Sequence, residues 1–355
     1  APVGVDVAAV RAAIAAAPSA WAKPRTSAQP WTPDAVELAG RVSRKDVSPA
    51  ELVEQAIRRI ETLQPQVQAI VTSDYERALD KAKAGKLSGP FAGVPFLVKD
   101  LDPYKGLPTR YGTRASIGAK PETEQTAYID AFDAAGFITL GKSTTPEYGF
   151  LPTTEPMGFL PTRNPWNVKH SSGGSSGGAG AGVASGMVSI AHASDGGGSI
   201  RIPAANCGLF GLKPSRGRMI PNRPSSRGID LSVSHVLTHS VRDSAAMFAA
   251  TEQTGANAPF KPIGMIGAPL KKKLKIGLVM NTGTGLAPDP EVQTAVNNAA
   301  KLLESLGHKV EPTTWPMDGA QFGQDFTALW ASGAAELVAG IGKAIGRKPD
   351  ATVLE

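Results

Sequence analysis

Residues 171–218 constrain the fold of this chain more than any other segment. They hold two clusters rich in glycine and serine, at residues 171–182 and 195–199, separated by the apolar run 183–191. Flexible linkers repeat glycine and serine without apolar anchors between them, so this segment is predicted to be rigid. Small side chains allow unusual backbone conformations and let another group approach closely. We therefore expect a nucleophilic serine here, together with the amides that stabilise its oxyanion.

Helix and strand patterns alternate over the rest of the chain. Ser48, Pro49 and Glu51 form a helix-start signal, and apolar residues follow at helical spacing up to Leu63. Strands are predicted at residues 66–72, within 89–101, at 137–140, at 275–280 as a buried strand, and at 308–312, with helices at 74–84, 126–135, 243–251, 289–306 and 326–345. Strands that alternate with helices indicate an α/β fold with a largely buried sheet.

The length of 355 residues suits one large domain or two ordinary ones. Residues 1–30 are rich in alanine and proline and are predicted to be an N-terminal extension, followed by one domain over residues 31–355. The last residues carry no stop signal, so we expect this domain to be incomplete at its C-terminus. The chain begins with Ala1 and shows no signal peptide. A cytoplasmic location and, if Ala1 is a processed N-terminus, a periplasmic or secreted one both remain open.

Composition argues against several classes of protein. No apolar run approaches the roughly 20 residues that a membrane-spanning helix needs, and no membrane association is predicted. The net charge of +6 comes from scattered basic residues without interleaved aromatic ones, so no nucleic-acid binding is predicted.

Few residues could bind a metal. The single cysteine, Cys207, excludes an internal disulfide and a thiolate-rich zinc site, and its apolar neighbours predict a buried, inert thiol. His235 and His239 are four residues apart in a segment that reads as strand or loop, which makes a pair of metal ligands improbable. We therefore predict neither a metal nor an organic cofactor.

Several known motifs were compared with the glycine-rich segment. A phosphate-binding P-loop does not fit, and Gly178, Gly180 and Gly182 lie too close together for a dinucleotide-binding fingerprint. Residues 173–177 match the GxSxG elbow of α/β-hydrolase esterases. That elbow also needs an acid and a histidine later in the chain, and the later histidines have no supporting context.

A hypothesis that uses both glycine-rich clusters and a lysine explains more of the sequence. Asp195 is followed by three glycines and Ser199, and successive amides of this kind can form an anion-binding nest. Ser199 could attack a carbonyl whose oxygen lies in the nest. Lys99 ends an apolar strand, where burial would favour its neutral form and allow it to accept a proton through Ser175. From the residues alone, a surface lysine at a strand end remains an alternative.

This arrangement resembles the amidase signature family. The matching segments are GGSSGG at residues 173–178, DGGGSIRIPA at 195–204 and GLKPSRGR at 211–218, with VPFLVKD at 94–100 further upstream. The resemblance implies one amidase-signature domain, in which a mixed twisted sheet is covered by helices on both faces. The C-terminal part that normally completes this sheet is absent from the sequence.

The resemblance also implies roles for individual residues. Ser199 would be the acyl-enzyme nucleophile, Ser175 the bridging serine reached through a cis peptide bond, and Lys99 the terminal base. The oxyanion amides would come from Gly196, Gly197 and Gly198, with Ser176, Asp195 and Arg201 as supports that hold the loop. Tyr148, Glu155 and Trp166 lie where the family lines its pocket, although packing in the core or in loops explains each of them equally well.

The implied function is hydrolysis of a carboxylic amide with release of ammonia or an amine. The segments TTEP and TRNPWN resemble the branch that contains cyclic-dimer hydrolases of nylon oligomers, aryl acylamidases and peptide amidases, which suggests a rather apolar amide. Two alternatives within the family are an amidotransferase subunit that acts with partners on glutamine and charged tRNA, and a non-catalytic member. A homodimer and a further C-terminal segment or chain are open as partners.

Overall fold

The computed structural model describes residues 33–222, 231–266, 268 and 270–355. The N-terminal extension predicted at residues 1–30 lies outside the described part of the chain. The chain divides into two compact units: a larger one that extends to residue 267 and also includes residues 351–355, and a smaller one over residues 268–350. The residues implied in catalysis all belong to the larger unit.

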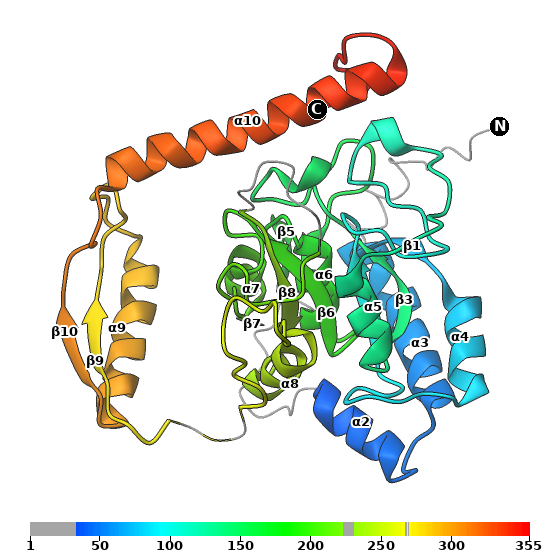
Figure 1. Cartoon of the computed structure of the whole chain (residues 1–355), viewed down its shortest axis with the longest axis horizontal. Coiled ribbons are helices and arrows are strands. Elements are labelled where there is room, and N and C mark those ends of the chain that lie inside the picture. The colour runs from blue at the N-terminus through cyan, green and yellow to red at the C-terminus, as the bar shows by residue number, and fades with distance from the viewer. Residues whose placement is uncertain (1–32, 223–230, 267, 269) are drawn as a thin grey trace. The chain divides into compact units, whose positions relative to one another are not determined.

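A six-stranded mixed sheet forms the centre of the larger unit, in the order β1-β3-β2-β6-β8-β7 (Figure 1). Its strands are β1 (Ile70–Ser73), β2 (Pro95–Lys99), β3 (Ile138–Ser143), β6 (Ile190–Asp195), β7 (Phe210–Gly211) and β8 (Val233–Thr238). Strand β2 pairs in parallel with both β3 and β6, whereas β1, β8 and β7 join antiparallel. The carboxyl ends of β2 and β6 therefore lie at the same edge of the sheet.

Helices cover both faces of this sheet, as predicted. One apolar cluster packs α3 (Pro49–Val67), α4 (Tyr75–Ala84) and α6 (Gly177–Ala184) on one face, and a second packs α2 (Ala35–Ser43), α5 (Ala127–Ala134) and α8 (Val241–Thr251) on the other. Side chains alternate along β2, so Leu97 joins the first cluster while Phe96 and Val98 join the second. Two residues after Leu97, Lys99 consequently lies on the face that α6 covers.

Local sequence signals explain where these elements begin and end. The predicted capping box at Ser48 and Glu51 is present at the start of α3. The strand predicted at residues 66–72 begins only at Ile70, because α3 buries Val67 as a continuation of its apolar stripe and is capped by Gln68, whose φ is 53°. Shorter elements complete the larger unit: η2 (Arg114–Ser116), η3 (Glu147–Gly149), the antiparallel pair β4 (Arg163–Asn164) and β5 (Asn167–Ser171), and α7 (Arg201–Cys207).

The smaller unit is built around a two-stranded parallel sheet of β9 (Lys275–Leu278) and β10 (Lys309–Pro312), with α9 (Pro290–Ser305) and α10 (Gly319–Ile345). The prediction of a buried strand at residues 275–280 is wrong, because β9 alternates between exposed and half-buried positions. Neither α9 nor α10 has a fully buried residue. Two strands have too little surface to enclose their own apolar side chains.

No helix in the described part of the chain has both the length and the apolar character needed to cross a membrane. The described residues also contain no group of three or more His, Cys, Asp or Glu side chains arranged to hold a metal ion. His235 lies in β8, which settles the choice between strand and loop, and its Nε2 is 2.9 Å from Oγ of Ser244.

We expect His235 to make the protein sensitive to acid. Burial, with a smaller contribution from His192, lowers the pKa of His235 to about 3 from its ordinary value of 6.5. As the pH falls below 6.5 the unfolded chain binds a proton at this residue and the folded chain does not. His235 should therefore cost about 1.4 kcal/mol of stability per pH unit between about pH 6 and pH 4.

Asp100 and Asp243 have the opposite effect on stability as the pH falls. Burial raises the pKa of each to about 6, so the folded chain binds a proton at these residues before the unfolded chain does. The test is therefore a difference between wild type and His235→Gln, with urea unfolding measured from pH 4 to pH 7. The variant should gain stability relative to wild type as the pH falls. A difference that stays constant across this range would contradict the assignment.

Candidate active site

Lys99 and Ser175 form the centre of the candidate site. The Nζ atom of Lys99 lies 2.8 Å from Oγ of Ser175 and 3.1 Å from Oγ of Ser194, and the lysine is fully buried. This burial excludes the alternative of a surface lysine. The peptide bond between Gly174 and Ser175 is cis, as the resemblance implies. A hydroxyl and a buried amine at this distance can exchange a proton.

Hydrogen bonds tie the two glycine-rich clusters together next to this pair. The backbone N–H of Ser176, at the start of α6, donates to the carbonyl of Ser199 at 3.3 Å. The hydroxyl of Ser176 donates to the carbonyl of Ser194 and accepts from the N–H of the same residue, each at 3.3 Å. Ser199, with 8% of its surface exposed, is thereby held against Ser176, four residues after the end of β6.

The three glycines before Ser199 differ in their surroundings. Gly197 is exposed and Gly196 half-exposed, so a ligand could reach these two amides. The N–H of Gly198 instead donates to Oδ1 of Asp195 at 2.8 Å, which differs from the oxyanion role predicted for it. Gly198 has a φ of 136°, which side chains rarely adopt, and a Cβ there would lie 2.7 Å from the side chain of Ile202, so a larger residue would strain the loop.

Asp195 and Arg201 hold the loop that carries Ser199. The guanidinium of Arg201 donates to both carboxylate oxygens of Asp195 at 2.9 Å, and the N–H of Ile200 donates to the same carboxylate at 3.1 Å. Burial raises the pKa of the Asp195 carboxyl, but the bonds from Arg201 and the backbone outweigh it and lower the pKa overall. The carboxylate therefore stays ionised and keeps the loop in place.

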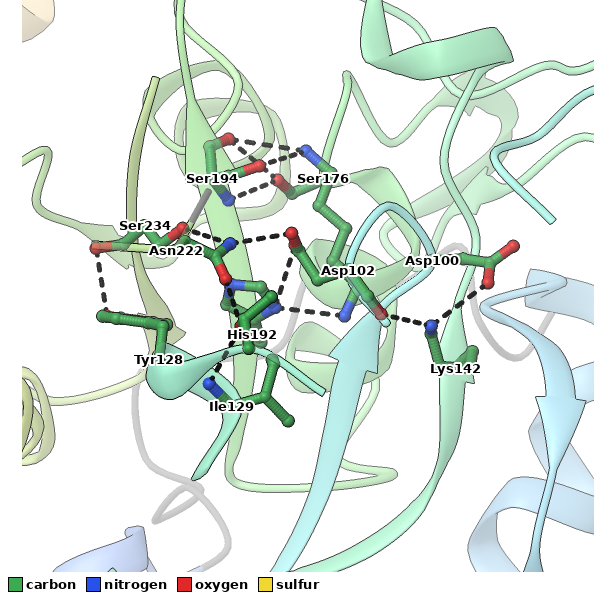
Figure 2. A network of polar contacts seen from close by, with 12 residues as sticks. Asp100, Asp102, Tyr128, Ile129, Lys142, Ser176, His192, Ser194, Asn222 and Ser234 are labelled. Atoms are coloured by element: carbon green, nitrogen blue, oxygen red, sulfur yellow. Dashed lines mark hydrogen bonds and ion pairs between the residues drawn. The ribbon is translucent and has the colours of Figure 1, made fainter. Parts of the chain in front are cut away.

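A buried polar network behind Lys99 was not predicted (Figure 2). Lys142 lies 3.6 Å from Asp100 and donates to the carbonyl of Asp102 at 2.6 Å. Burial raises the pKa of Asp100 to about 6 and lowers that of Lys142, and the attraction between them partly offsets both shifts. The signal in the sequence was a charged residue, Lys142, inside an otherwise uncharged strand.

The other side of this network joins β2 to β6 and β8. The side chain of Asn222 donates to Asp102 at 2.7 Å and to Ser234 at 3.1 Å. The backbone N–H of Lys99 lies 3.4 Å from Nδ1 of His192 on β6. Figure 2 shows His192 and Asp102 between Ser194 on one side and the Lys142–Asp100 pair on the other. Polar contacts of Asp102, which follows β2, and of the Lys99 backbone thus help to hold the strand that carries Lys99.

The residues predicted near the pocket have separate surroundings. Tyr148 stacks on Tyr111, Glu155 pairs with Arg163 at 3.4 Å, and the indole N–H of Trp166 donates to the carbonyl of Cys207 at 2.7 Å. The structure therefore places Trp166 in packing against the end of α7. Cys207 is buried as predicted, and burial raises the pKa of its thiol to about 12.

A cleft of about 740 Å³ lies elsewhere, between α4, the loop at residues 104–106 and α5, and includes none of the residues implied in catalysis. Two of its charged side chains, Lys81 and Asp133, pair with each other at 2.7 Å.

Comparisons with known proteins give a consistent result. The family profile described as Amidase matches residues 51–347. A protein named Putative amidase AmiC, from Mycobacterium tuberculosis (strain ATCC 25618 / H37Rv), is 39% identical over 327 residues, which cover 91% of this chain and 68% of that protein.

Two solved structures resemble the chain in fold as well as in sequence. A structure of 6-aminohexanoate cyclic dimer hydrolase complexed with substrate is 32% identical with a TM-score of 0.82, covering 91% of this chain and 69% of that one. A bacterial aryl acylamidase of the amidase signature enzymes is 31% identical with a TM-score of 0.78, covering 88% of this chain and 67% of that one.

Proposed function

Because this chain belongs to the amidase signature family of amide-hydrolysing enzymes, we propose that it cleaves amides through an acyl-enzyme on Ser199. The observation that carries the proposal is the 2.8 Å contact between the buried amine of Lys99 and the hydroxyl of Ser175. The bond from Ser176 to the Ser199 carbonyl supports placing the nucleophile at this proton route.

The proposed reaction has two halves. Ser199 loses its proton to Ser175, which passes its own to the neutral amine of Lys99, and Oγ of Ser199 bonds to the amide carbon. The oxyanion accepts hydrogen bonds from the amides of Gly196 and Gly197, the pair that a ligand can reach. The C–N bond then breaks as the proton returns through Ser175 to the leaving nitrogen. Water cleaves the ester by the same route and releases a carboxylic acid.

Two other readings have less support. An esterase elbow at residues 173–177 would need a histidine base for Ser175, yet His235 is 2.9 Å from Ser244 and His239 contacts the carbonyl of Val183 at 2.8 Å. An amidotransferase subunit would need partners and charged tRNA, whereas three similar proteins are named as an amidase, a cyclic dimer hydrolase and an aryl acylamidase.

A fluorophosphonate probe tests the assignment of the nucleophile. We expect a single adduct, which peptide mass spectrometry places on Ser199, and loss of turnover in step with labelling on a panel of aliphatic amides, anilides and peptide amides. The matched control is Ser185→Ala, which removes a hydroxyl that donates to the carbonyl of Gly182 in α6. An adduct on Ser175 would instead indicate the esterase elbow.

A further inference from the structure

The cleft between α4 and α5 has two walls of opposite charge. Its volume of about 740 Å³ lies within the usual range of small-molecule sites. One wall is formed by α4 and the loop at residues 104–106, and the other by the segment at residues 123–133. The charged side chains that line the cleft are Arg77, Lys81 and Lys105 on the first, basic wall, and Glu124, Asp130 and Asp133 on the second, acidic wall.

Hydrogen bonds fix the two walls relative to each other. Lys81 pairs with Asp133 at 2.7 Å, and the N–H of Lys105 donates to Oε1 of Gln125 at 3.2 Å. The side-chain amide of Gln125 also donates to Asp130 at 2.8 Å and to Asp133 at 2.9 Å. The cleft is therefore formed before any ligand arrives, and binding would cost little ordering of its walls.

Buried residues form the floor of the cleft. Tyr104 is 7% exposed and Thr139 is 5% exposed. Strand β1 pairs with β3 only at residues 141–143, so Thr139, earlier in β3, is left to line the cleft. The guanidinium of Arg77 lies over the Tyr104 ring, 5.3 Å from its centroid, and is paired with Asp74. The most buried part of the cleft thus offers a ring and a methyl group, which can contact the carbon chain of a ligand.

Lys105 and Glu124 are the charges most open to a ligand. Both side chains are exposed, and within the described part of the chain neither forms an ion pair or a side-chain hydrogen bond. Their backbone segments lie side by side, because the N–H of Gly106 donates to the carbonyl of Glu122 at 2.8 Å. The cleft therefore presents one cation and one carboxylate on adjacent segments.

We propose that this cleft is a second binding site, separate from the candidate active site, for a small zwitterion that carries one carboxylate and one ammonium group, as amino acids do. Lys105 binds the carboxylate and Glu124 the ammonium, while the carbon chain lies on Tyr104. The lining has three positive and three negative charges, so it is neutral as a whole and complements a molecule with both signs. A simple anion or cation would leave the opposite wall without a partner.

Four compounds of five carbons each test the need for both charges. At pH 7, 5-aminopentanoate and L-norvaline carry a carboxylate and an ammonium, pentanoate carries only the first and pentylamine only the second. The two zwitterions differ in the spacing of their charges. In ligand-observed NMR titrations we expect at least one zwitterion to bind about 3- to 10-fold more tightly than either simple ion.

Substitutions at the two open charges locate the binding. Lys105→Gln should weaken binding of the zwitterion about 3- to 10-fold and leave pentylamine unaffected, and Glu124→Gln should weaken it equally and leave pentanoate unaffected. The matched control is Lys83→Gln, which removes an exposed positive charge from α4 outside the cleft and should change no affinity. All three side chains are exposed, so the variants should remain folded with wild-type turnover.

Two results would overturn the proposal. One is that neither zwitterion binds more tightly than pentanoate and pentylamine, which would leave at most a site for a single ion on one wall. The other is that Lys105→Gln and Glu124→Gln bind the zwitterions as wild type does, which would place the binding elsewhere on the molecule. None of these titrations involves hydrolysis, so a failure of the proposed amidase activity would leave their outcome unchanged.

Discussion

Replacing Ser199 by alanine is expected to abolish amide hydrolysis and leave the chain folded. Without the hydroxyl no acyl-enzyme can form, and loss of a serine nucleophile in a comparable enzyme costs about 10⁶-fold in kcat. The oxyanion amides and substrate binding would remain, so a residual rate above that in water is expected. Steady-state kinetics on the best amide of the panel measures the loss.

The fold should tolerate this change because Ser199 is held through its backbone carbonyl, which the substitution preserves. Urea unfolding of Ser199→Ala should therefore differ little from wild type. Ser185→Ala removes a hydroxyl of the same kind from the far end of α6 and should keep turnover near wild type. Turnover of Ser199→Ala within tenfold of wild type would refute the assignment of the nucleophile.

Lys99→Met should give the second largest loss. Methionine fills a similar volume without an amine, so Ser175 loses the group that accepts its proton. A positioned general base contributes about 10²- to 10⁴-fold, and we expect kcat to fall within that range at every pH. Substitution by an uncharged side chain leaves no unpaired charge in this buried position, so the variant should remain folded.

A second buried lysine provides a matched control. Lys142 is also fully buried, but it contacts Asp100 and the carbonyl of Asp102 on the far side of the network. Removing Lys142 alone would leave the buried Asp100 carboxyl without its cationic partner. Breaking a buried ion pair in this way costs about 3–5 kcal/mol of folding stability. The double variant Lys142→Met/Asp100→Asn removes both charges and should keep far more activity than Lys99→Met. Equal losses in the two would mean that Lys99 has only a structural role.

The sequence alone predicted the elements of the candidate site because its motifs carry a chemical requirement. Small residues around Ser175 and Ser199, and a lysine at the end of an apolar strand, were enough to predict a proton route, and the structure brings Lys99 to 2.8 Å from Ser175. The partner of the Gly198 amide could not be predicted, because Asp195 can accept from Arg201, from the backbone or from both. The direction in which a carboxylate turns depends on packing that no local pattern encodes.

For the fold too, the local elements could be predicted from the sequence, whereas their packing could not. Helix caps and apolar periodicity are local, and they placed α3, α4 and α8 to within a few residues. The strand at residues 275–280 was predicted as buried because its side chains are apolar, but a pattern records which residues can be buried and not what covers them. The stacking of Tyr111 on Tyr148 was not predicted either, because it joins two loops from different parts of the chain and a local pattern does not record such contacts.

The parallel pairing of β2 with β6 has a consequence for the time at which catalysis becomes possible. Lys99 and Ser175 are separated by 76 positions in the sequence, and the two strands pair through Leu97 and Ala191. Contacts between distant segments form slowly, since the chain loses loop entropy before it gains the pairing energy. An intermediate with its helices formed but without this pairing would carry both serines without the proposed base, Lys99, beside them. Recovery of activity during refolding therefore reports completion of the central sheet.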